Sequence, residues 1–386
     1  MTPSAQSHNA TPVVSSWIFL ALACVGLWAY LVMARPVMGD DGFVYQSFSE
    51  ILVDEGRFDF KNHYGFMGLS LLNAPVYFLT RSHNSIIYTS LGLMFLLLPI
   101  GYWTALRLGL SDKASRMALC LLLLYPEPQV VLFKGFQEAA HLVFAVFTLG
   151  LLAGPVVLWT PLVFGFTCII KPFAAAYLPI LLPNFLTRKR WWLLLLGAVW
   201  VIIHLGLTWL QTGHLINSSV NNIYNAHDIP NLKQNFNFSP GSWISLLHAL
   251  FISVQMQVSP VIILAGLWGI CKMKCSIKPS LLLLAVMINW VMVGLMVGMF
   301  SKYLLPATVL LIFTAAPVLS ARPAWMIMTF VTSLPMLWYL HYAYIGTFWN
   351  HTPILMIPAC TALILWCWLE RTWLLQQWRD MMERRL

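Results

Sequence analysis

The stretch 17–48, WIFLALACVGLWAYLVMARPVMGDDGFVYQSF, decides the fold, because a long uncharged run comes directly before two adjacent aspartates. The run 17–34 is close to the ~20 residues that an α-helix needs to cross a bilayer. It is not followed by a small-residue cleavage site of the kind that ends a signal peptide. We therefore expect a retained membrane span, with Asp40 and Asp41 just beyond its end.

The rest of the chain has the same character. Of its 386 residues 60% are hydrophobic and only 9% are charged, and the mean hydropathy is +0.76. Apolar segments that could form helical spans recur at 17–34, 86–108, 114–125, 139–153, 155–170, 173–187, 191–210, 243–271, 280–300, 303–320, 324–345 and 353–369. The sequence therefore predicts an all-α, polytopic transmembrane helix bundle of about 12 spans, forming one integral-membrane domain over residues 1–386.

The distribution of charge sets the orientation of this bundle. With a cytoplasmic N-terminus, 14 of the 22 Lys and Arg residues lie in inside loops and 9 of the 13 acidic residues lie outside, as the positive-inside rule expects. Both termini are then cytoplasmic, in the inner (plasma) membrane or, in a eukaryotic cell, the ER membrane. Anchoring to an anionic leaflet accounts for the net charge of +9 better than nucleic-acid binding does. The tail 370–386 interleaves Trp and Leu with charge, which is typical of a cytoplasmic amphipathic interfacial helix.

Motifs for other kinds of chemistry are missing from the sequence. Five of the seven cysteines lie in spans, where they act as small apolar residues. There is no Walker loop, GxGxxG, HExxH or GxSxG pattern to suggest ATP, NAD, zinc-protease or serine-nucleophile chemistry. The polar features that remain are two large outer loops, 35–85 and 211–242, and the first of them holds six of the 13 acidic residues.

The adjacent aspartates are the strongest candidates for a functional site. Two neighbouring carboxylates repel, so at least one should be hydrogen-bonded, paired with a cation, bound to a metal ion or raised in pKa. The alternative is that one of them is an N-cap, because a helix over GFVYQSFSEILVDEG would begin here.

The residues around the pair resemble a known family. The stretch 39–58, GDDGFVYQSFSEILVDEGRF, is similar to the first outer loop of the GT-C superfamily of polytopic membrane glycosyltransferases, in the branch of the aminoarabinose and protein mannosyltransferases. In that loop an Asp-Asp or Asp-Glu pair precedes a Tyr and an amphipathic helix ending in Gly. Four further stretches fit the resemblance: YGFMGLSLLNAPVYFLT (64–80), FKGFQEAAH (133–141), GFTCIIKPFAAAYLPILLPNFLTRKRWW (165–192) and SKYLLPATVLLIF (301–313).

The resemblance implies a GT-C-type bundle whose first outer loop is helical, and a transfer reaction on the outer face. The donor is then a polyprenyl-phosphate sugar, and the acceptor is a lipid, a glycan or a protein. Asp40 is expected to be the base that takes the acceptor proton. Asp41 is expected to orient it or to bind a divalent cation, the one cofactor that the pattern suggests. The family often has Glu where Asp41 stands.

Two lysines at the ends of spans are candidates for binding the donor phosphate. Lys171 interrupts two apolar stretches, and a charge at such a depth is treated as functional by default, with snorkelling to the interface as the alternative. Lys302 and Tyr303 open a later span where the family has Arg-Tyr, and an aromatic-belt tyrosine is the alternative there.

Two further pairs are candidates for binding an acceptor or a metal ion. Glu138 and His141 are three residues apart, so they share one face of a helix, although a lone His near a span is more often simply hydrogen-bonded. His227 and Asp228 lie in the second outer loop, where they could cover the site as a lid, and a solvated loop is the alternative.

Three functions are compatible with the sequence. The first is an inverting glycosyltransferase that uses a polyprenyl-phosphate sugar on the outer face. The second is a flippase or transporter for a polyprenyl lipid or glycan, which should place charged residues along a path across the bilayer. The third is a non-catalytic assembly subunit, which would not need the Asp pair.

Overall fold

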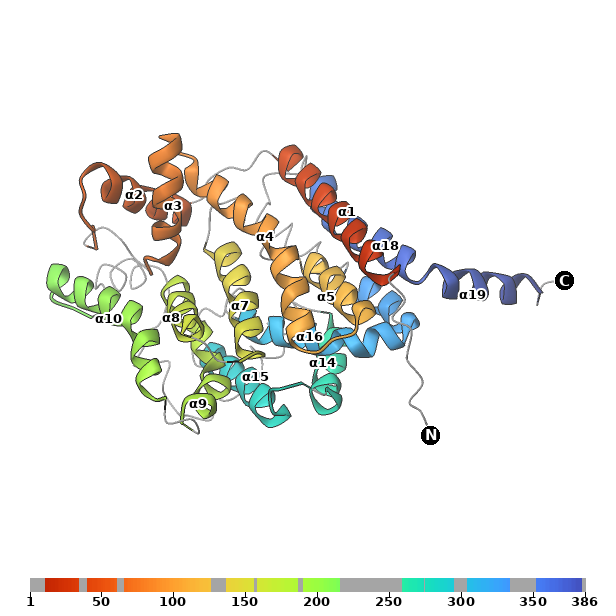
Figure 1. Ribbon diagram of the computed structural model, residues 1–386. Helices are drawn as coiled ribbons and strands as arrows, with labels where there is room; N and C mark the ends of the chain where they lie inside the picture. Colours follow the sequence, from red (N-terminus) through yellow and green to blue (C-terminus); the bar gives the residue numbers. More distant parts are fainter. Residues whose placement is uncertain are drawn as a thin grey trace, which may run out of the picture.

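The computed structural model describes residues 11–34, 40–60, 66–125, 137–155, 158–186, 190–215, 259–273, 275–294, 304–333 and 352–383. The regular structure of these residues is helical throughout, and no strand occurs among them (Figure 1). The helices are α1 (Thr11–Ala34), α2 (Asp40–Asp54), α3 (Gly68–Thr80), α4 (Ser85–Arg107), α5 (Asp112–Leu124), α7 (Glu138–Leu152), α8 (Trp159–Ile170), the 3-10 helix η1 (Pro172–Tyr177), α9 (Leu178–Leu186), α10 (Trp192–Thr212), α14 (Pro260–Lys272), α15 (Pro279–Gly294), α16 (Leu305–Ala321), the helical residues 323–333, α18 (Thr352–Leu369) and α19 (Arg371–Glu383).

Each of the twelve predicted spans overlaps a helix of this bundle. The helices α4 and α10 are long and apolar enough to cross a membrane, and nine shorter apolar helices accompany them among the described residues. The predicted span 173–187 is instead divided between the 3-10 helix η1, which begins at Pro172, and the short helix α9, which continues through Pro183. Of the predicted span 243–271, the part before residue 259 lies outside the described residues.

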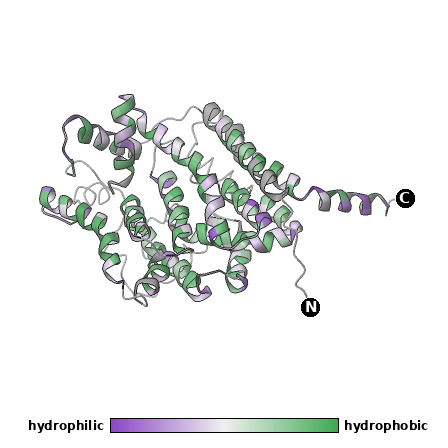
Figure 2. Ribbon diagram, viewed as in Figure 1, coloured by the Kyte–Doolittle hydropathy of each residue, from purple (hydrophilic) through white to green (hydrophobic). Residues whose placement is uncertain are grey.

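Hydrophobic residues predominate along the bundle helices (Figure 2), and many large apolar side chains among them are exposed. On α10 the exposed fractions of Ile202 and Leu210 are 61% and 72%. Water would make such exposure unfavourable, whereas lipid chains are as apolar as these side chains. The helices approach closely where small residues allow it, and a Cβ on Gly269 of α14 would come within 1.8 Å of the carbonyl oxygen of Thr314 in α16. This is the packing expected of helices within a membrane.

The helix termini gather at two opposite ends of the bundle. At one end, which we call the basic end, lie Arg107, Lys113, Lys272, Arg322 and Arg371. Lys113 forms a 2.7 Å ion pair with Glu370 at this end. Lys113, Lys272 and Ala321 also line one pocket there. The opposite end, which we call the aspartate end, holds α2, α3 and the first turn of α7 (Figure 1). Lys113 and Lys272 therefore lie at the end of the bundle opposite to α2, which carries the two aspartates.

The first outer loop is helical, as the resemblance predicted. Helix α2 is amphipathic and buries Tyr45 and Phe48, which are 3% and 2% exposed, against the bundle. Helix α3 follows and ends at Arg81, whose positive φ of 51° forms a left-handed C-cap. These two helices form a separate layer at the aspartate end (Figure 1).

Candidate functional site

The adjacent aspartates occupy the first turn of α2. Helix α2 begins at Asp40, so Asp40 and Asp41 lie where the exposed N–H groups and the helix dipole favour a negative charge. Their backbone is described, and the orientation of their side chains lies outside the description. The capping role and the catalytic role of the two aspartates both stay predictions.

A buried glutamine fixes the helix that carries the aspartates. Gln46 is 3% exposed and lies about a turn and a half after Asp40 on α2. Its side-chain oxygen accepts hydrogen bonds from the amide of Asn73 at 3.1 Å, the hydroxyl of Ser85 at 3.0 Å and the backbone N–H of Ile86 at 3.0 Å. Its amide nitrogen donates to Glu50 at 2.8 Å. One side chain thus joins α2, α3 and α4, and sequence reasoning did not single it out.

Other polar contacts join α2 to α3 on either side of Gln46. The hydroxyl of Ser49 donates to the carbonyl of Ser70 at 3.0 Å, and Ser70 donates to the carbonyl of Tyr45 at 3.1 Å. At the end of α2, Asp54 accepts a 2.8 Å hydrogen bond from Tyr77 and forms an ion pair with Arg81. The hydrogen bond to Asp54 raises the pKa of Tyr77 above its ordinary value. Because buried polar groups so paired resist displacement, α2 is held rigidly.

Lys171 forms a buried ion pair with Glu138. Lys171 stands in an extended conformation between α8 and η1, and Glu138 is the first residue of α7. The two side chains are 3% and 2% exposed. Pro172 prevents α8 from continuing in regular form, so the lysine turns inward at this break. The snorkelling alternative for Lys171 is wrong in this structure, because snorkelling requires the ammonium to reach the surface.

His141 lies one turn after Glu138 on α7 and is fully buried. Neither of its ring nitrogens has a hydrogen-bond partner among the described residues. Within the same part of the chain, no group of three or more His, Cys, Asp or Glu residues is placed to hold a metal ion. Metal binding by Glu138 and His141 therefore stays a prediction that would need a ligand from elsewhere, since two protein ligands seldom suffice.

One apolar cluster brings the two candidate regions together. Tyr45 of α2, Leu69 of α3 and Ile86 of α4 pack with Ala140, which lies between Glu138 and His141, and with Ile170, which precedes Lys171. The start of α3 also touches α8, because a Cβ on Gly68 would come within 2.7 Å of the backbone nitrogen of Ile170. The aspartate helix and the Lys171–Glu138 pair are thus anchored on the same core, although they are about a hundred residues apart in the chain.

The middle of the first outer loop is attached to α10. The side chain of Gln211 accepts from the backbone N–H of Phe60 at 2.8 Å and donates to the carbonyl of Phe58 at 2.7 Å. Beside this contact, His204 stacks on Phe66 with ring centres 4.8 Å apart. These contacts hold the loop in place at the aspartate end, and nothing in the sequence indicated them.

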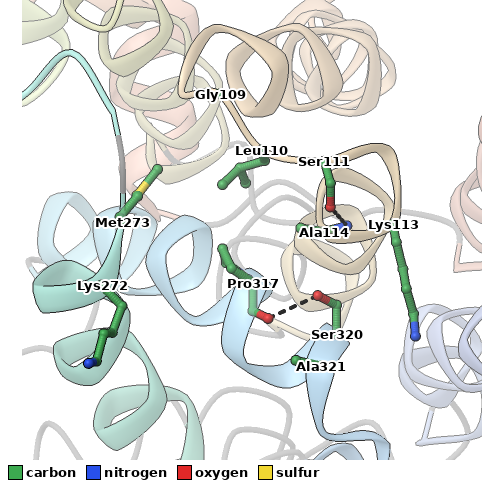
Figure 3. Close-up of a pocket in the computed structure, with 10 residues that line it drawn as sticks. All are labelled: Gly109, Leu110, Ser111, Lys113, Ala114, Lys272, Met273, Pro317, Ser320 and Ala321. Atoms are coloured by element: carbon green, nitrogen blue, oxygen red, sulfur yellow. Dashed lines mark hydrogen bonds between the residues drawn. The ribbon is translucent and has the colours of Figure 1, made fainter. Parts of the chain in front are cut away.

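A pocket of about 620 Å³ lies at the opposite, basic end, between α5, α14 and α16 (Figure 3). Ser111 accepts a hydrogen bond from the N–H of Ala114, and Ser320 donates to the carbonyl of Pro317. The amino groups of Lys113 and Lys272 extend away from its centre on opposite sides (Figure 3). None of the predicted site residues lines this pocket.

The remaining candidates, Lys302, Tyr303, His227 and Asp228, lie outside the described residues. Their predicted roles in phosphate binding and as a lid stay predictions.

Solved structures share this arrangement of helices. A crystal structure of ArnT from Cupriavidus metallidurans bound to undecaprenyl phosphate matches with a TM-score of 0.55 and 14% sequence identity, over 94% of this chain and 76% of that protein. The apo form of the same ArnT matches with a TM-score of 0.54 and 14% identity, over 92% of this chain and 76% of ArnT. No protein-family model and no curated protein matches the sequence. The chain therefore shares the helical fold of ArnT, which confirms the fold that the resemblance predicted.

Proposed function

We propose that this protein is an integral-membrane glycosyltransferase that transfers a sugar from a polyprenyl-phosphate donor to an acceptor on the outer face, with inversion. The observation that carries the proposal is the fold shared with ArnT over 94% of the chain, since ArnT was solved with undecaprenyl phosphate bound. The fold alone hosts more than one function, so the assignment also depends on the residues at the aspartate end.

The proposed reaction is a single displacement. Asp40 takes the proton of the acceptor hydroxyl while the acceptor oxygen attacks the anomeric carbon of the sugar. The bond from that carbon to the phosphate oxygen breaks, and polyprenyl phosphate leaves with the bonding electrons. A positioned general base typically contributes ~10² to 10⁴ in rate. Asp41 orients Asp40 or binds a divalent cation that neutralises the leaving phosphate.

Lys171 is the proposed cation that binds the donor phosphate, and Glu138 is proposed to hold the Lys171 ammonium in place. A lysine ammonium in a nearly water-free site is stable only beside an opposite charge. Glu138 supplies that charge and holds the ammonium at the end of α8. Lys302 and Tyr303, which precede α16 in the sequence, are proposed to contact the same phosphate. His141, His227 and Asp228 are proposed to contact the acceptor.

The position of the charges favours an enzyme over a flippase. Among the described residues, the charged side chains of the membrane helices lie at or near helix ends, as Glu138, Lys171, Arg107 and Lys113 do. A carrier for a charged lipid headgroup is expected to have polar groups along its path.

The decisive experiment is a transfer assay with the purified protein in lipid nanodiscs. Radiolabelled polyprenyl-phosphate sugars are supplied together with an extract of membrane-lipid acceptors. Label that moves to an acceptor in wild type, but not in Asp40→Asn, supports the proposal, and the product identifies the donor and the acceptor class. Movement of unmodified donor between leaflets, without any transfer, would favour the flippase.

A further inference from the structure

Four tryptophan–cation pairs lie at the basic end. The guanidinium carbon of Arg107 lies 5.5 Å from the ring centre of Trp103, that of Arg322 lies 4.8 Å from Trp325, and that of Arg371 lies 5.6 Å from Trp368. A fourth pair joins Lys272 and Trp268 at 5.9 Å. They come from four different helices, α4, α14, the residues 323–333 and the α18–α19 junction. Tryptophans and basic residues concentrate where a membrane meets water, so these pairs locate that boundary.

Helix α19 starts at this boundary. It begins at Arg371, the cation of one of these pairs. Beyond its first turn, where Trp373 and Leu374 pack against the core, it stands clear of the bundle (Figure 1). The residue before it, Glu370, is held at the basic end by its ion pair with Lys113, and its side chain is only 4% exposed. The start of α19 is therefore fixed at the membrane surface.

One face of α19 is apolar and uncovered. The apolar positions 374, 375, 378, 381 and 382 recur at intervals of three and four residues, which places them on one side of a helix. Leu375, Trp378, Met381 and Met382 are 54%, 57%, 46% and 42% exposed, and no residue of α19 is buried. On the opposite side Gln376 donates a 2.9 Å hydrogen bond to Asp380, and Trp373 packs partly against the bundle.

We infer that α19 lies in the plane of an anionic lipid surface, with Leu375, Trp378, Met381 and Met382 among the lipid chains. A helix with this composition is stable at the headgroup level, because its apolar face enters the acyl region while its polar face stays in water. Arg371 and Arg379 are placed to contact lipid phosphates. The helix thereby holds the end of α18 at the boundary, in addition to the tryptophan–cation pairs.

The inference is tested on the full-length protein with an environment-sensitive dye. The exposed native cysteines Cys271 and Cys360 are replaced by serine. A new cysteine is then placed on the apolar face by Met382→Cys or on the polar face by Gln376→Cys. Each variant is labelled and reconstituted with one copy per nanodisc. The dye signal of the protein that carries only the two serine replacements is subtracted as background.

The dye at position 382 should be shielded from water and quenched by nitroxides on the lipid chains, while the dye at 376 should be neither. Leu375→Cys gives a second apolar-face position in case one label distorts the helix. Equal exposure to water at 375, 382 and 376 would overturn the inference. Shielding of the dye at 382 without quenching by lipid nitroxides would also overturn the inference, because a protein surface would then cover the apolar face. The same conclusion would follow if the dye were shielded only in discs that hold several copies of the protein.

The charge of the lipid provides an independent test. Replacing Arg379 by Gln should lower the ratio of lipid-embedded to water-exposed dye about fivefold in discs with anionic lipid, since one basic residue near such a surface contributes about that factor. The same substitution should have little effect in neutral lipid. An equal effect in both lipids would contradict the electrostatic part of the inference.

Discussion

The Lys171–Glu138 pair provides a test that separates folding from donor binding. Replacing Lys171 by Met leaves the Glu138 carboxylate buried without the ammonium that compensates it. Breaking a buried ion pair in this way costs about 3–5 kcal/mol. At about 2 °C per kcal/mol for a large domain, the melting temperature should fall by roughly 6–10 °C. A loss of donor binding in this variant could therefore come either from lower stability or from the missing phosphate contact.

The double variant Lys171→Met with Glu138→Gln removes that ambiguity. With both charges gone, no buried charge is left uncompensated, so most of the lost stability should return. A lysine that donates a charge-assisted hydrogen bond to phosphate contributes about 1.5–3 kcal/mol, which is roughly 10- to 100-fold in the dissociation constant. We expect the double variant to melt near wild type and to bind donor that much more weakly.

The assay is a thermal melt and a donor-binding titration on the wild type, the two single variants and the double variant. Lys113→Met is the matched control, since Lys113 also pairs with a buried glutamate, Glu370, but at the basic end. It should lower stability without changing donor affinity. A double variant that is stable and binds donor like wild type would refute phosphate binding by Lys171. Single-variant losses that simply add in the double variant would refute the coupling of the pair.

Three further predictions concern the aspartates, the packing and the orientation. Asp40→Asn should lower turnover by ~10² or more with little change in donor binding, measured by single-turnover transfer and by titration, and near-normal turnover would reduce the aspartate to a capping role. Gly68→Ala should lower the free energy of unfolding by about 1–3 kcal/mol, because its Cβ would collide with the backbone of α8, whereas Gly92→Ala meets nothing within 4 Å and should be neutral in the same melt. A cysteine at Asn235 should react with an impermeant reagent added outside intact cells, and one at Ser276 should not; the reverse pattern would place the aspartate end in the cytoplasm.

Much of the fold could be predicted from the sequence, because a membrane span is specified locally. Twenty apolar residues must form a helix in lipid, since no water is present to satisfy the backbone, whatever the rest of the chain does. The bounds predicted for α4, 86–108, therefore differ by one residue from Ser85–Arg107. The charge of each loop can likewise be read from the residues of that loop alone. The helical character of the first outer loop was instead predicted from the family resemblance of the stretches 39–58 and 64–80.

The pairing of side chains between distant segments was decided by the tertiary structure alone. Lys171 and Glu138 were each singled out in the sequence, but as separate phosphate and metal candidates, and their ion pair depends on the packing of α7 against α8. Gln46 and Gln211 carried no signal at all, because a glutamine in an amphipathic segment is unremarkable until its partners are known. Hydropathy records how each residue prefers lipid or water, whereas hydrogen bonds and ion pairs depend on distances of about 3 Å between groups from different helices. Such distances exist only once the helices have packed.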